Sequence, residues 1–374
     1  MLTIMKGLRI NGFDPYVVMH GGGYFESLLK ESAIPYEIVP LASNASVISR
    51  NRRVGLADLP AAAMQVLRTA HKISKVARSW KIDLIHANHL SGYLSCSLAA
   101  KRNRIPNIWH LHEGLAVGVV SQVLQRSASV LTNHVITMAP YEASTVEYMT
   151  RQVDHTMIEG AFAFDELLAS RKRSGLEIRS EFGIEPTDVL VAYVSHLAPY
   201  KGQGTFLESF SRLPQNAGYR ALLVGGPRKS FEWFSKELRA DVNSLGLEGR
   251  VQLCGYRADV PDIMNAADIV VCVSRSEEFN RVLVEAMAFG KPVIASDLRG
   301  ASIVVEHGAT GLLVRPGDAT ELMRALLALQ DEQLRARLGE AARKYALERF
   351  SVERAILKYR RVYDSLLGKD AQHA

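Results

Sequence analysis

Two glutamates lie on either side of the start of one short predicted helix in the second half of the chain. Glu277 precedes the helix Arg281–Phe289 and Glu285 follows eight positions later; Asn280 is a suitable N-cap and Gly290 ends the helix. A helix start has unpaired N–H groups and a partial positive charge that suit a diphosphate. Carboxylates beside it can accept hydrogen bonds from sugar hydroxyls. The alternative is an ordinary loop glutamate and surface helix glutamate.

A lysine at the end of a buried-type strand is the second chemical feature of this half. The apolar run Val189–Val194 leads into a loop that carries His196 and then Lys201 and Gly202. A lysine at the carboxyl end of a parallel strand can reach an anionic ligand in the crevice of the sheet. The alternative is a solvated lysine. Phosphate binding is favoured because this segment and the glutamate pair occur in sequence order.

Histidines follow two predicted strands, Leu84–His86 and Asn107–Leu111, in the first half of the chain. The candidates at these carboxyl ends are His86, His89, His112 and Glu113. Such ends face the ligand crevice of a parallel sheet, so these side chains are candidate site residues. For His86 and for His110, a structural histidine held by hydrogen bonds is an equally good interpretation.

The elements that must position these residues alternate along nearly the whole chain. Short apolar runs ending in small or polar residues are separated by segments of helical period, which is typical of parallel sheets with helices on both faces. The pattern predicts an α/β protein with two doubly wound, Rossmann-like sheets in series. The predicted strands are Tyr16–Met19, Glu37–Pro40, Leu84–His86, Asn107–Leu111, Val135–Met138, Val189–Val194, Ala221–Val224, Val251–Leu253, Ile269–Val273 and Pro292–Ala295.

The length of 374 residues also predicts two domains. A charged segment between Gly160 and Ile184 marks the boundary, so we expect domains at 1–165 and 166–350, followed by a last helix within 351–374. The first convincing strand, Tyr16–Met19, is already the second in a doubly wound scheme. We therefore expect the first domain to lack its first β–α unit.

Composition and charge exclude several classes. Apolar residues make up 48% and charged residues 22%, as in soluble globular proteins, and we see neither a membrane-spanning run nor a signal peptide, so we expect a cytoplasmic protein. The three cysteines have spacing for neither a disulfide framework nor a zinc site. The sequence has no Asp-x-Asp and no cluster with metal-ligand spacing, so we predict no metal and no cofactor.

The net charge of +6 is concentrated in the first half, where residues 1–160 hold 16 Lys and Arg against 11 Asp and Glu. The predicted helix Pro60–Trp80 has an apolar stripe and a basic stripe with Arg68, Lys72 and Lys75. This basic face can rest on an anionic membrane surface, although an ordinary surface helix with its stripe packed on the sheet is the better explanation of the apolar side. We expect no nucleic acid, since aromatic residues are not interleaved with the basic ones.

Three runs of sequence resemble one enzyme family. They are CGYRADVPDIMNAAD at 254–268, EEFNRVLVEAMAFGKPVIA at 277–295 and GATGLLVRPGD at 308–318. The chain is similar to retaining glycosyltransferase family 4 (glycosyl transferases group 1), most strongly from Val189 to Tyr363. The resemblance implies the GT-B architecture, with two Rossmann-like domains facing each other across a cleft. Residues 1–165 would bind the acceptor and 166–350 the nucleotide-sugar donor, and the last helix would return to the first domain.

The resemblance implies a role for individual residues. Glu277 would hold donor-sugar hydroxyls, Glu285 the ribose and Lys201 the diphosphate, and His112 would lie near the reaction centre; His112, Lys201 and Glu277 are the catalytic candidates. The donor-binding set is His196, Lys201, Tyr256, Arg257, Glu277, Phe279, Asn280, Arg281, Val282 and Glu285. The acceptor-side set is Gly21, Gly22, His86, His89 and Glu113.

The expected reaction moves a sugar, such as a hexose, from a UDP- or GDP-linked donor to a glycan or lipid-linked acceptor. The resemblance implies retention of anomeric configuration by front-face displacement, and the missing Asp-x-Asp predicts a reaction without a metal. We expect this reaction to be a step in cell-surface polysaccharide or glycolipid synthesis on the inner face of a membrane. The sequence departs from the family at His196, where an arginine is usual, and at Glu278 and Asn280, where glycines are usual. The alternative is a catalytically impaired nucleotide-sugar-binding partner protein. A phosphorylase or epimerase of the same architecture is also left open.

Overall fold

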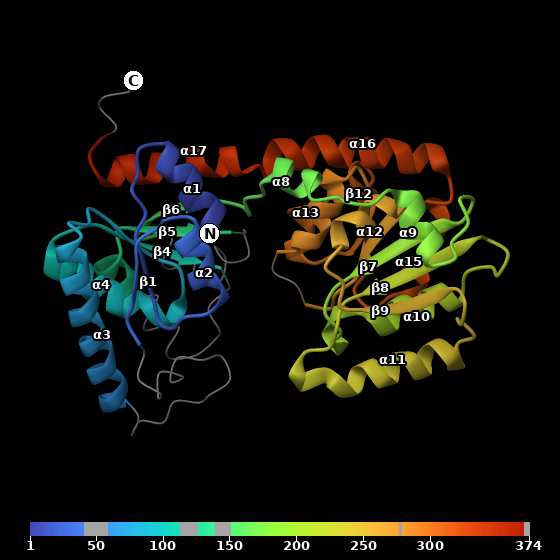
Figure 1. Ribbon diagram of the computed structural model, residues 1–374, viewed down its shortest axis with the longest axis horizontal. Helices are drawn as coiled ribbons and strands as arrows, with labels where there is room; N and C mark the ends of the chain where they lie inside the picture. The colour runs from blue at the N-terminus through green and yellow to red at the C-terminus, as the bar shows by residue number, and fades with distance from the viewer. Residues whose placement is uncertain (41–58, 113–125, 139–150, 277–278, 370–374) are drawn as a thin grey trace. The chain divides into compact units, whose positions relative to one another are not determined.

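The structure is a computed structural model that describes residues 1–40, 59–112, 126–138, 151–276 and 279–369. The chain divides into two compact units (Figure 1). Unit 1 comprises Met1–Ala161 and Val352–Ala374, and unit 2 comprises Phe162–Ser351.

Unit 1 is built from short parallel strands and the helices around them. Its strands are β1 (Val17–Met19), β2 (Tyr36–Ile38), β3 (Ile85–Ala87), β4 (Asn107–Leu111), β5 (His134–Thr137) and β6 (Asp154–Met157). Its helices are α1 (Leu2–Ile10), α2 (Tyr24–Glu31), α3 (Leu59–Ser79), α4 (Tyr93–Asn103) and α17 (Val352–Leu366), with the 3-10 turn η3 (Leu90–Gly92).

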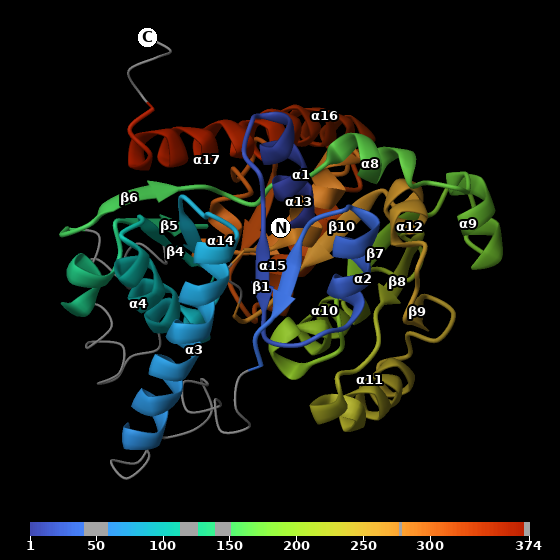
Figure 2. The same cartoon turned by 60° about the vertical axis from the view of Figure 1, so that its left-hand side comes forward.

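The strands of unit 1 form two separate parallel sheets. One pairs β1 with β2 and the other has the order β3-β4-β5-β6. Helix α1 comes before β1 and packs against α17, where a side chain at Gly7 would collide with Ile356. Figure 2 shows α3 running beside α4, with which it packs. The last helix of the chain is thus part of the framework of unit 1.

Unit 2 contains a larger sheet covered by helices on both sides. Its strands are β7 (Val189–Val194), β8 (Tyr219–Val224), β9 (Val251–Gly255), β10 (Ile269–Cys272), β11 (Val293–Ser296) and β12 (Gly311–Val314). Its helices are α8 (Phe164–Ala169), α9 (Gly175–Glu181), α10 (Gln203–Ser211), α11 (Glu232–Ser244), α12 (Val260–Ala266), α13 (Arg281–Ala288), α14 (Arg299–Ser302), α15 (Ala319–Ala328) and α16 (Glu332–Arg349), with the 3-10 turns η4 (Pro199–Lys201) and η5 (Lys229–Phe231).

All six strands of unit 2 run parallel in the order β12-β11-β10-β7-β8-β9. Every residue of β7 is buried, and successive side chains enter opposite cores: Leu190 and Ala192 belong to one apolar cluster, Val191 and Tyr193 to the other. A strand covered on both faces needs an unbroken apolar run, which is why VLVAYV does not alternate with polar residues.

Each of the ten predicted strands is present, with ends shifted by at most two residues. The prediction missed β6 and β12, which both lie at the edge of a sheet. The sequence of β6 is DHTM, and none of its residues is fully buried. Strands at an edge need less apolar character, so the hydrophobic pattern predicts them poorly.

Candidate active site

The sheet of unit 2 has its topological switch point at β7. Ala192 of this strand pairs with Leu222 of β8 on one side and with Val270 of β10 on the other. In open α/β sheets, ligands bind beyond the carboxyl ends of the strands at such a point. The segments that leave it are the loop after β7, which contains His196 and Lys201, and the loop between β10 and α13.

The loop after β7 is held tightly against its neighbour. Gly202 has φ +82°, and a Cβ there would lie 2.0 Å from the carbonyl oxygen of Val273, so no side chain fits. Gln203 is fully buried, and its amide nitrogen donates to Ser195 Oγ at 2.8 Å and to the carbonyl oxygen of His196 at 3.0 Å. These contacts fix the backbone that carries the predicted phosphate-binding side chains.

A tyrosine links His196 to Lys201 within this loop. Nε2 of His196 lies 2.7 Å from the hydroxyl of Tyr200, and Nζ of Lys201 lies 5.6 Å from the centre of the Tyr200 ring. The carbonyl oxygen of Tyr200 accepts from the backbone N–H of Arg275 at 2.8 Å. Tyr200 therefore ties the loop after β7 to the loop after β10, and both cationic candidates lie beside its ring.

Helix α13 begins at the other side of the switch point. Asn280 occupies the N-cap position, but its side chain makes no capping hydrogen bond; its amide nitrogen instead donates to Cys272 Sγ at 2.6 Å. The first N–H groups of α13 are thus not capped by this side chain, which suits an anionic ligand. Phe279 packs edge-on against Phe350, and Val282 also packs against the apolar core, so these two can offer a ligand backbone groups.

Glu285 and Arg281 lie one turn apart on α13. Burial raises the pKa of the Glu285 carboxyl above its ordinary value, and its Oε1 lies 3.8 Å from the Arg281 guanidinium. Arg281 is exposed and stacks over the ring of Phe162 at 4.6 Å. A half-buried carboxylate at the start of a helix is well placed to accept hydrogen bonds from a ligand's hydroxyl groups. Glu277, Glu278 and Glu113 lie outside the described residues.

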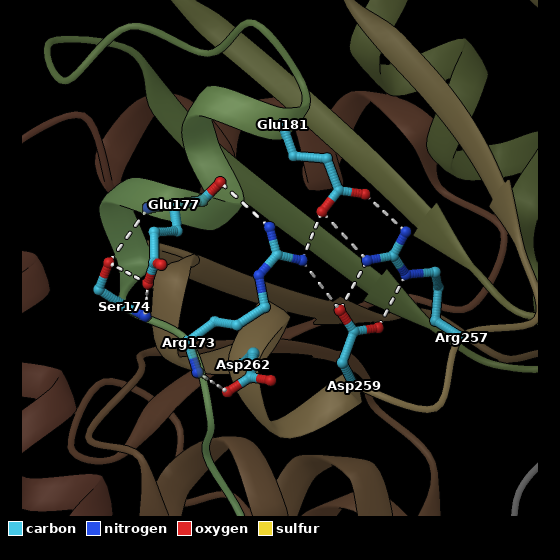
Figure 3. Close-up of polar contacts among 7 residues, drawn as sticks. All are labelled: Arg173, Ser174, Glu177, Glu181, Arg257, Asp259 and Asp262. Atoms are coloured by element: carbon cyan, nitrogen blue, oxygen red, sulfur yellow. Dashed lines mark hydrogen bonds and ion pairs between the residues drawn. The ribbon is translucent and has the colours of Figure 1, made fainter.

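Arg257 is engaged in a network of ion pairs (Figure 3). Its guanidinium lies 2.7 Å from Glu181 and 2.6 Å from Asp259, and these hydrogen bonds raise its pKa. Arg173 joins the same two carboxylates, at 2.5 Å and 3.4 Å. A donor-binding role for Arg257 stays a prediction, and it would compete with these contacts. The neighbouring Tyr256 is 84% exposed.

The predicted histidines of unit 1 come together at the carboxyl ends of the adjacent strands β3 and β4. Nε2 of His86 lies 3.1 Å from Nδ1 of His110, and the rings of His110 and His112 are 4.1 Å apart. Nδ1 of His86 lies 2.6 Å from the hydroxyl of Tyr363 on α17. Burial lowers the pKa of His86 to about 3 and that of His110 well below its ordinary value, so both are neutral at pH 7.

His112 follows β4 and has contacts with two further residues. Its Nδ1 lies 2.9 Å from Met138 Sδ and its Nε2 lies 3.4 Å from Asn88 Oδ1. His89 is exposed and differs from the others, because its Nδ1 accepts from the backbone N–H of Ser91 and caps η3. This capping contact gives His89 a structural role.

Gly21 and Gly22, the remaining acceptor-side candidates, follow β1 and precede α2, and both are exposed. Their role stays a prediction. Within the described parts of the chain, no group of three or more His, Cys, Asp or Glu residues has the arrangement of a metal site. Among the same residues, no helix is long and apolar enough to span a membrane.

Four contact residues were missed by the sequence analysis: Tyr200, Gln203, Asn88 and Tyr363. Tyr363 lies on the apolar stripe of the last predicted helix, where an aromatic residue is normally a core residue. Gln203 directly follows the Lys201-Gly202 pair, but the sequence does not show that its side chain is completely buried. A polar side chain buried beside a site is identified by its contacts, which sequence spacing does not contain.

The family model described as glycosyl transferases group 1 matches residues 176–345 of this chain. This match covers nearly all of unit 2, including the loop after β7 and helix α13. N-acetyl-alpha-D-glucosaminyl L-malate synthase of Bacillus anthracis is 27% identical over 318 residues, which are 81% of this chain and 80% of that protein. A D-inositol 3-phosphate glycosyltransferase of Corynebacterium glutamicum is 30% identical over 71% of this chain and 63% of that protein.

Solved structures extend the similarity to both units. Anabaena HepE in complex with UDP matches with a TM-score of 0.80 and 28% identity, over 97% of this chain and 94% of that one. The complex of the same protein with UDP-glucose matches with a TM-score of 0.77. The chain has the GT-B fold with two Rossmann-like domains, and these matches support a glycosyltransferase.

Proposed function

We propose that this chain is a glycosyltransferase of family 4 that takes its sugar from a UDP-linked donor held by unit 2. The observation that carries the proposal is the pair of loops at the switch point between β7 and β10. One contributes His196 and the cation Lys201, and the other leads into the start of α13, which the Asn280 side chain does not cap. The similarity to a protein that was solved with UDP and with UDP-glucose supports uracil as the base.

The proposed mechanism stabilises the charge of the departing diphosphate. Lys201, the His196 loop and the N–H groups at the start of α13 supply this stabilisation electrostatically, without a metal in the proposed reaction. Glu285 accepts hydrogen bonds from the ribose and Glu277 from the donor sugar. Because the departing oxygen and the acceptor share one face of the sugar, the anomeric configuration is retained.

On the acceptor side, we propose that His112 lies at the reaction centre and that the Gly21-Gly22 segment binds the acceptor. The acceptor is a glycan or a lipid-linked saccharide of cell-surface polysaccharide or glycolipid synthesis. This assignment extends the family resemblance to unit 1. His112 is restrained by Asn88, Met138 and the ring of His110, as a residue needs to be if it orients a reacting group.

The surface of helix α3 supports the proposal that this acceptor is bound at the surface of a membrane. Along α3, Met64 and Leu67 are 50% and 55% exposed, Lys72 and Lys75 are exposed, and the helix contains no acidic residue. Exposed apolar side chains next to cations suit the interface of an anionic membrane. We expect flotation with vesicles containing phosphatidylglycerol but not with pure phosphatidylcholine, and Lys72→Glu with Lys75→Glu to abolish it. Unchanged flotation of this variant would reject the assignment to α3.

Calorimetric titration of UDP-glucose, UDP-N-acetylglucosamine and GDP-mannose tests the donor assignment. We expect the UDP-sugars to bind and Glu285→Ala to weaken their binding by about 10-fold or more, because a half-buried carboxylate that bonds a ligand hydroxyl in the proposed complex is lost. Glu340→Ala on α16, an exposed glutamate, is the matched control. Binding without sugar transfer to any acceptor would favour the impaired partner protein, and absence of all binding would reject the donor site. Release of UDP only when acceptor is present would exclude an epimerase or phosphorylase.

A further inference from the structure

A chain of hydrogen bonds connects the last helix of unit 1 to the histidines of β3 and β4. The hydroxyl of Tyr363 on α17 lies 2.6 Å from Nδ1 of His86. Nε2 of His86 lies 3.1 Å from Nδ1 of His110, whose ring lies 4.1 Å from that of His112. Residues 277 positions apart in the sequence are thus joined in one array.

The direction of these hydrogen bonds follows from the partners that each group has. Within the described residues, His86 is the one hydrogen-bond partner of the Tyr363 hydroxyl. If the hydroxyl donates to Nδ1 of His86, then His86 carries its proton on Nε2 and donates to Nδ1 of His110. Nε2 of His110 has no hydrogen-bond partner within the described residues in either direction. The reverse direction would in addition leave the hydroxyl proton of Tyr363 without an acceptor, which is costly for a group packed inside the unit. The forward direction also assigns the proton of His110 to Nε2.

The surroundings hold this array in place. The Tyr363 ring packs edge-on against Phe13 at 5.4 Å, and the ring of Tyr359 lies 5.9 Å from both His86 and His110. His110 is 1% exposed. Helix α17 is itself anchored, because Lys358 Nζ lies 2.6 Å from Glu159 and 3.2 Å from the carbonyl oxygen of Met157. The tyrosine hydroxyl therefore meets His86 from a rigid helix.

We propose that Tyr363 is a positioning residue for sugar transfer, which fixes the tautomers of His86 and His110 and thereby the orientation of His112. The proposal rests on the proposed function for the role of His112 only. Tyr363 does not touch the substrate; it acts through two neutral imidazoles. Loss of its hydroxyl frees His86 to exchange tautomers, and the Nε2–Nδ1 hydrogen bond to His110 loses its single direction. The His110 ring, which packs against His112, is then no longer held in one tautomer.

The chain provides a matched pair of variants for the test. Tyr363→Phe removes the hydroxyl that bonds His86, whereas Tyr359→Phe removes a hydroxyl from the same helix that has no hydrogen bond among the described residues. With histidine labelled by 15N, the ring-nitrogen shifts distinguish the two neutral tautomers. We expect wild type and Tyr359→Phe to show the Nε2–H form for both buried histidines. Tyr363→Phe should show averaged or Nδ1–H signals.

The second measurement is steady-state kinetics with UDP-glucose and an acceptor to which the wild type transfers sugar. We expect Tyr363→Phe to lower kcat by about 3- to 10-fold, the equivalent of one buried hydrogen bond, with KM for the donor within 2-fold of wild type. Tyr359→Phe should retain wild-type kcat. A change in KM alone, or equal losses in both variants, would indicate only a structural role and overturn the proposal.

The two measurements also separate this proposal from the proposed function. If the wild type transfers no sugar, the proposed function fails before any variant is compared. Unchanged tautomers in Tyr363→Phe overturn the positioning proposal whether or not the wild type is active. Altered tautomers with unaltered kcat overturn it as well, because the array would then have no influence on the reaction.

Discussion

Nε2 of His196 lies 2.7 Å from the hydroxyl of Tyr200. Both residues are also held through their backbones, since Gln203 donates to the carbonyl oxygen of His196 and Arg275 donates to that of Tyr200. The orientation of the imidazole is therefore set by the protein before a ligand arrives. An imidazole stands here where the resembling family usually has a guanidinium, so the charge offered to a diphosphate depends on pH.

We expect His196→Arg to bind UDP about 3- to 10-fold more tightly than wild type at pH 8, because a guanidinium stays charged where an imidazole is largely neutral. Calorimetry at pH 6 and pH 8 measures the effect, and the difference between the two proteins should shrink at pH 6. Tyr200→Phe, which keeps the ring, is expected to weaken UDP binding by about 2- to 3-fold through loss of one hydrogen bond. Equal affinities of wild type for UDP at both pH values would contradict this view of His196.

Replacement of Gly202 should damage the same loop. Gly202→Ala places a Cβ 2.0 Å from the carbonyl oxygen of Val273 at φ +82°, so the loop must move away from β10. We expect a loss of about 2–3 kcal/mol in the free energy of unfolding, together with at least 10-fold weaker UDP binding.

Gly204→Ala is the control for this substitution, because a Cβ at Gly204 has nothing within 4 Å and the residue lies in α10. That variant should be stabilised by about 0.5–1 kcal/mol and bind UDP normally. Urea denaturation measures the unfolding free energies of Gly202→Ala and Gly204→Ala, and calorimetry measures their affinities for UDP. Wild-type binding by Gly202→Ala would show that the close approach of the two loops is not needed for the donor site.

The ion-pair network of Arg257 leads to a prediction that separates structure from donor binding. Arg257→Ala breaks contacts to Glu181 and Asp259, and we expect the unfolding free energy to fall by about 1–2 kcal/mol. UDP affinity should remain within 2-fold of wild type, because the guanidinium already has carboxylate partners.

A double-mutant cycle of Arg257→Ala with Glu181→Gln measures the coupling within this network, for which we expect about 1 kcal/mol. Lys236→Ala, on the exposed side of α11, serves as the reference for removal of a surface cation. A large loss of UDP affinity with unchanged stability would assign Arg257 to the donor site instead.

Acid should destabilise unit 1 through its buried histidines. Burial lowers the pKa of His86 from 6.5 to about 3, and it lowers those of His110, His134 and His155 as well. Below pH 6.5 the unfolded chain binds protons that the folded unit does not, so stability is complete above this pH and falls as the pH drops toward 3. At pH 5 the expected cost is roughly 2 kcal/mol for His86, and His110 adds to the loss in the same direction.

Urea denaturation at pH 7.5 and pH 5.0 measures this loss, above the range where most carboxylates titrate. His86→Gln should reduce the difference in unfolding free energy between the two pH values, whatever its effect on stability at pH 7.5. His71→Gln, at an exposed position of α3, should leave the difference unchanged. Equal stability of the wild type at both pH values would show that these histidines protonate in the folded state.

Local sequence patterns predicted most of the strands and the loops that carry the candidate donor residues. A strand buried on both faces, such as Val189–Val194, must be continuously apolar, so its sequence reveals it. The residues after such strands lie at the edge of a parallel sheet, and this relation places Lys201 and the start of α13 at that edge. Their role in donor binding stays a prediction. The short edge strand β6 was missed because partial exposure removes that pattern.

The contacts among the site residues could not be predicted in the same way. Arg257 looked like a candidate for the nucleotide because it belongs to a family motif, yet its guanidinium lies between Glu181 and Asp259. The partner of His86 was also not accessible from spacing, because Tyr363 lies 277 positions away on another element. Side-chain pairing depends on rotamers and packing, whereas spacing records only which face of an element a residue occupies.

The sequence by itself determined the fold class, the parallel order of strand and helix, and the two loops in which the candidate phosphate-binding residues lie. Those properties depend on hydrophobic period and on helix start and stop signals, which are local. Only the tertiary structure decided that Gln203 and Tyr200 hold His196, that Arg257 is ion-paired, and that α17 meets the histidines of β3 and β4. Those properties depend on which distant surfaces pack together, and a linear pattern does not specify the pairing.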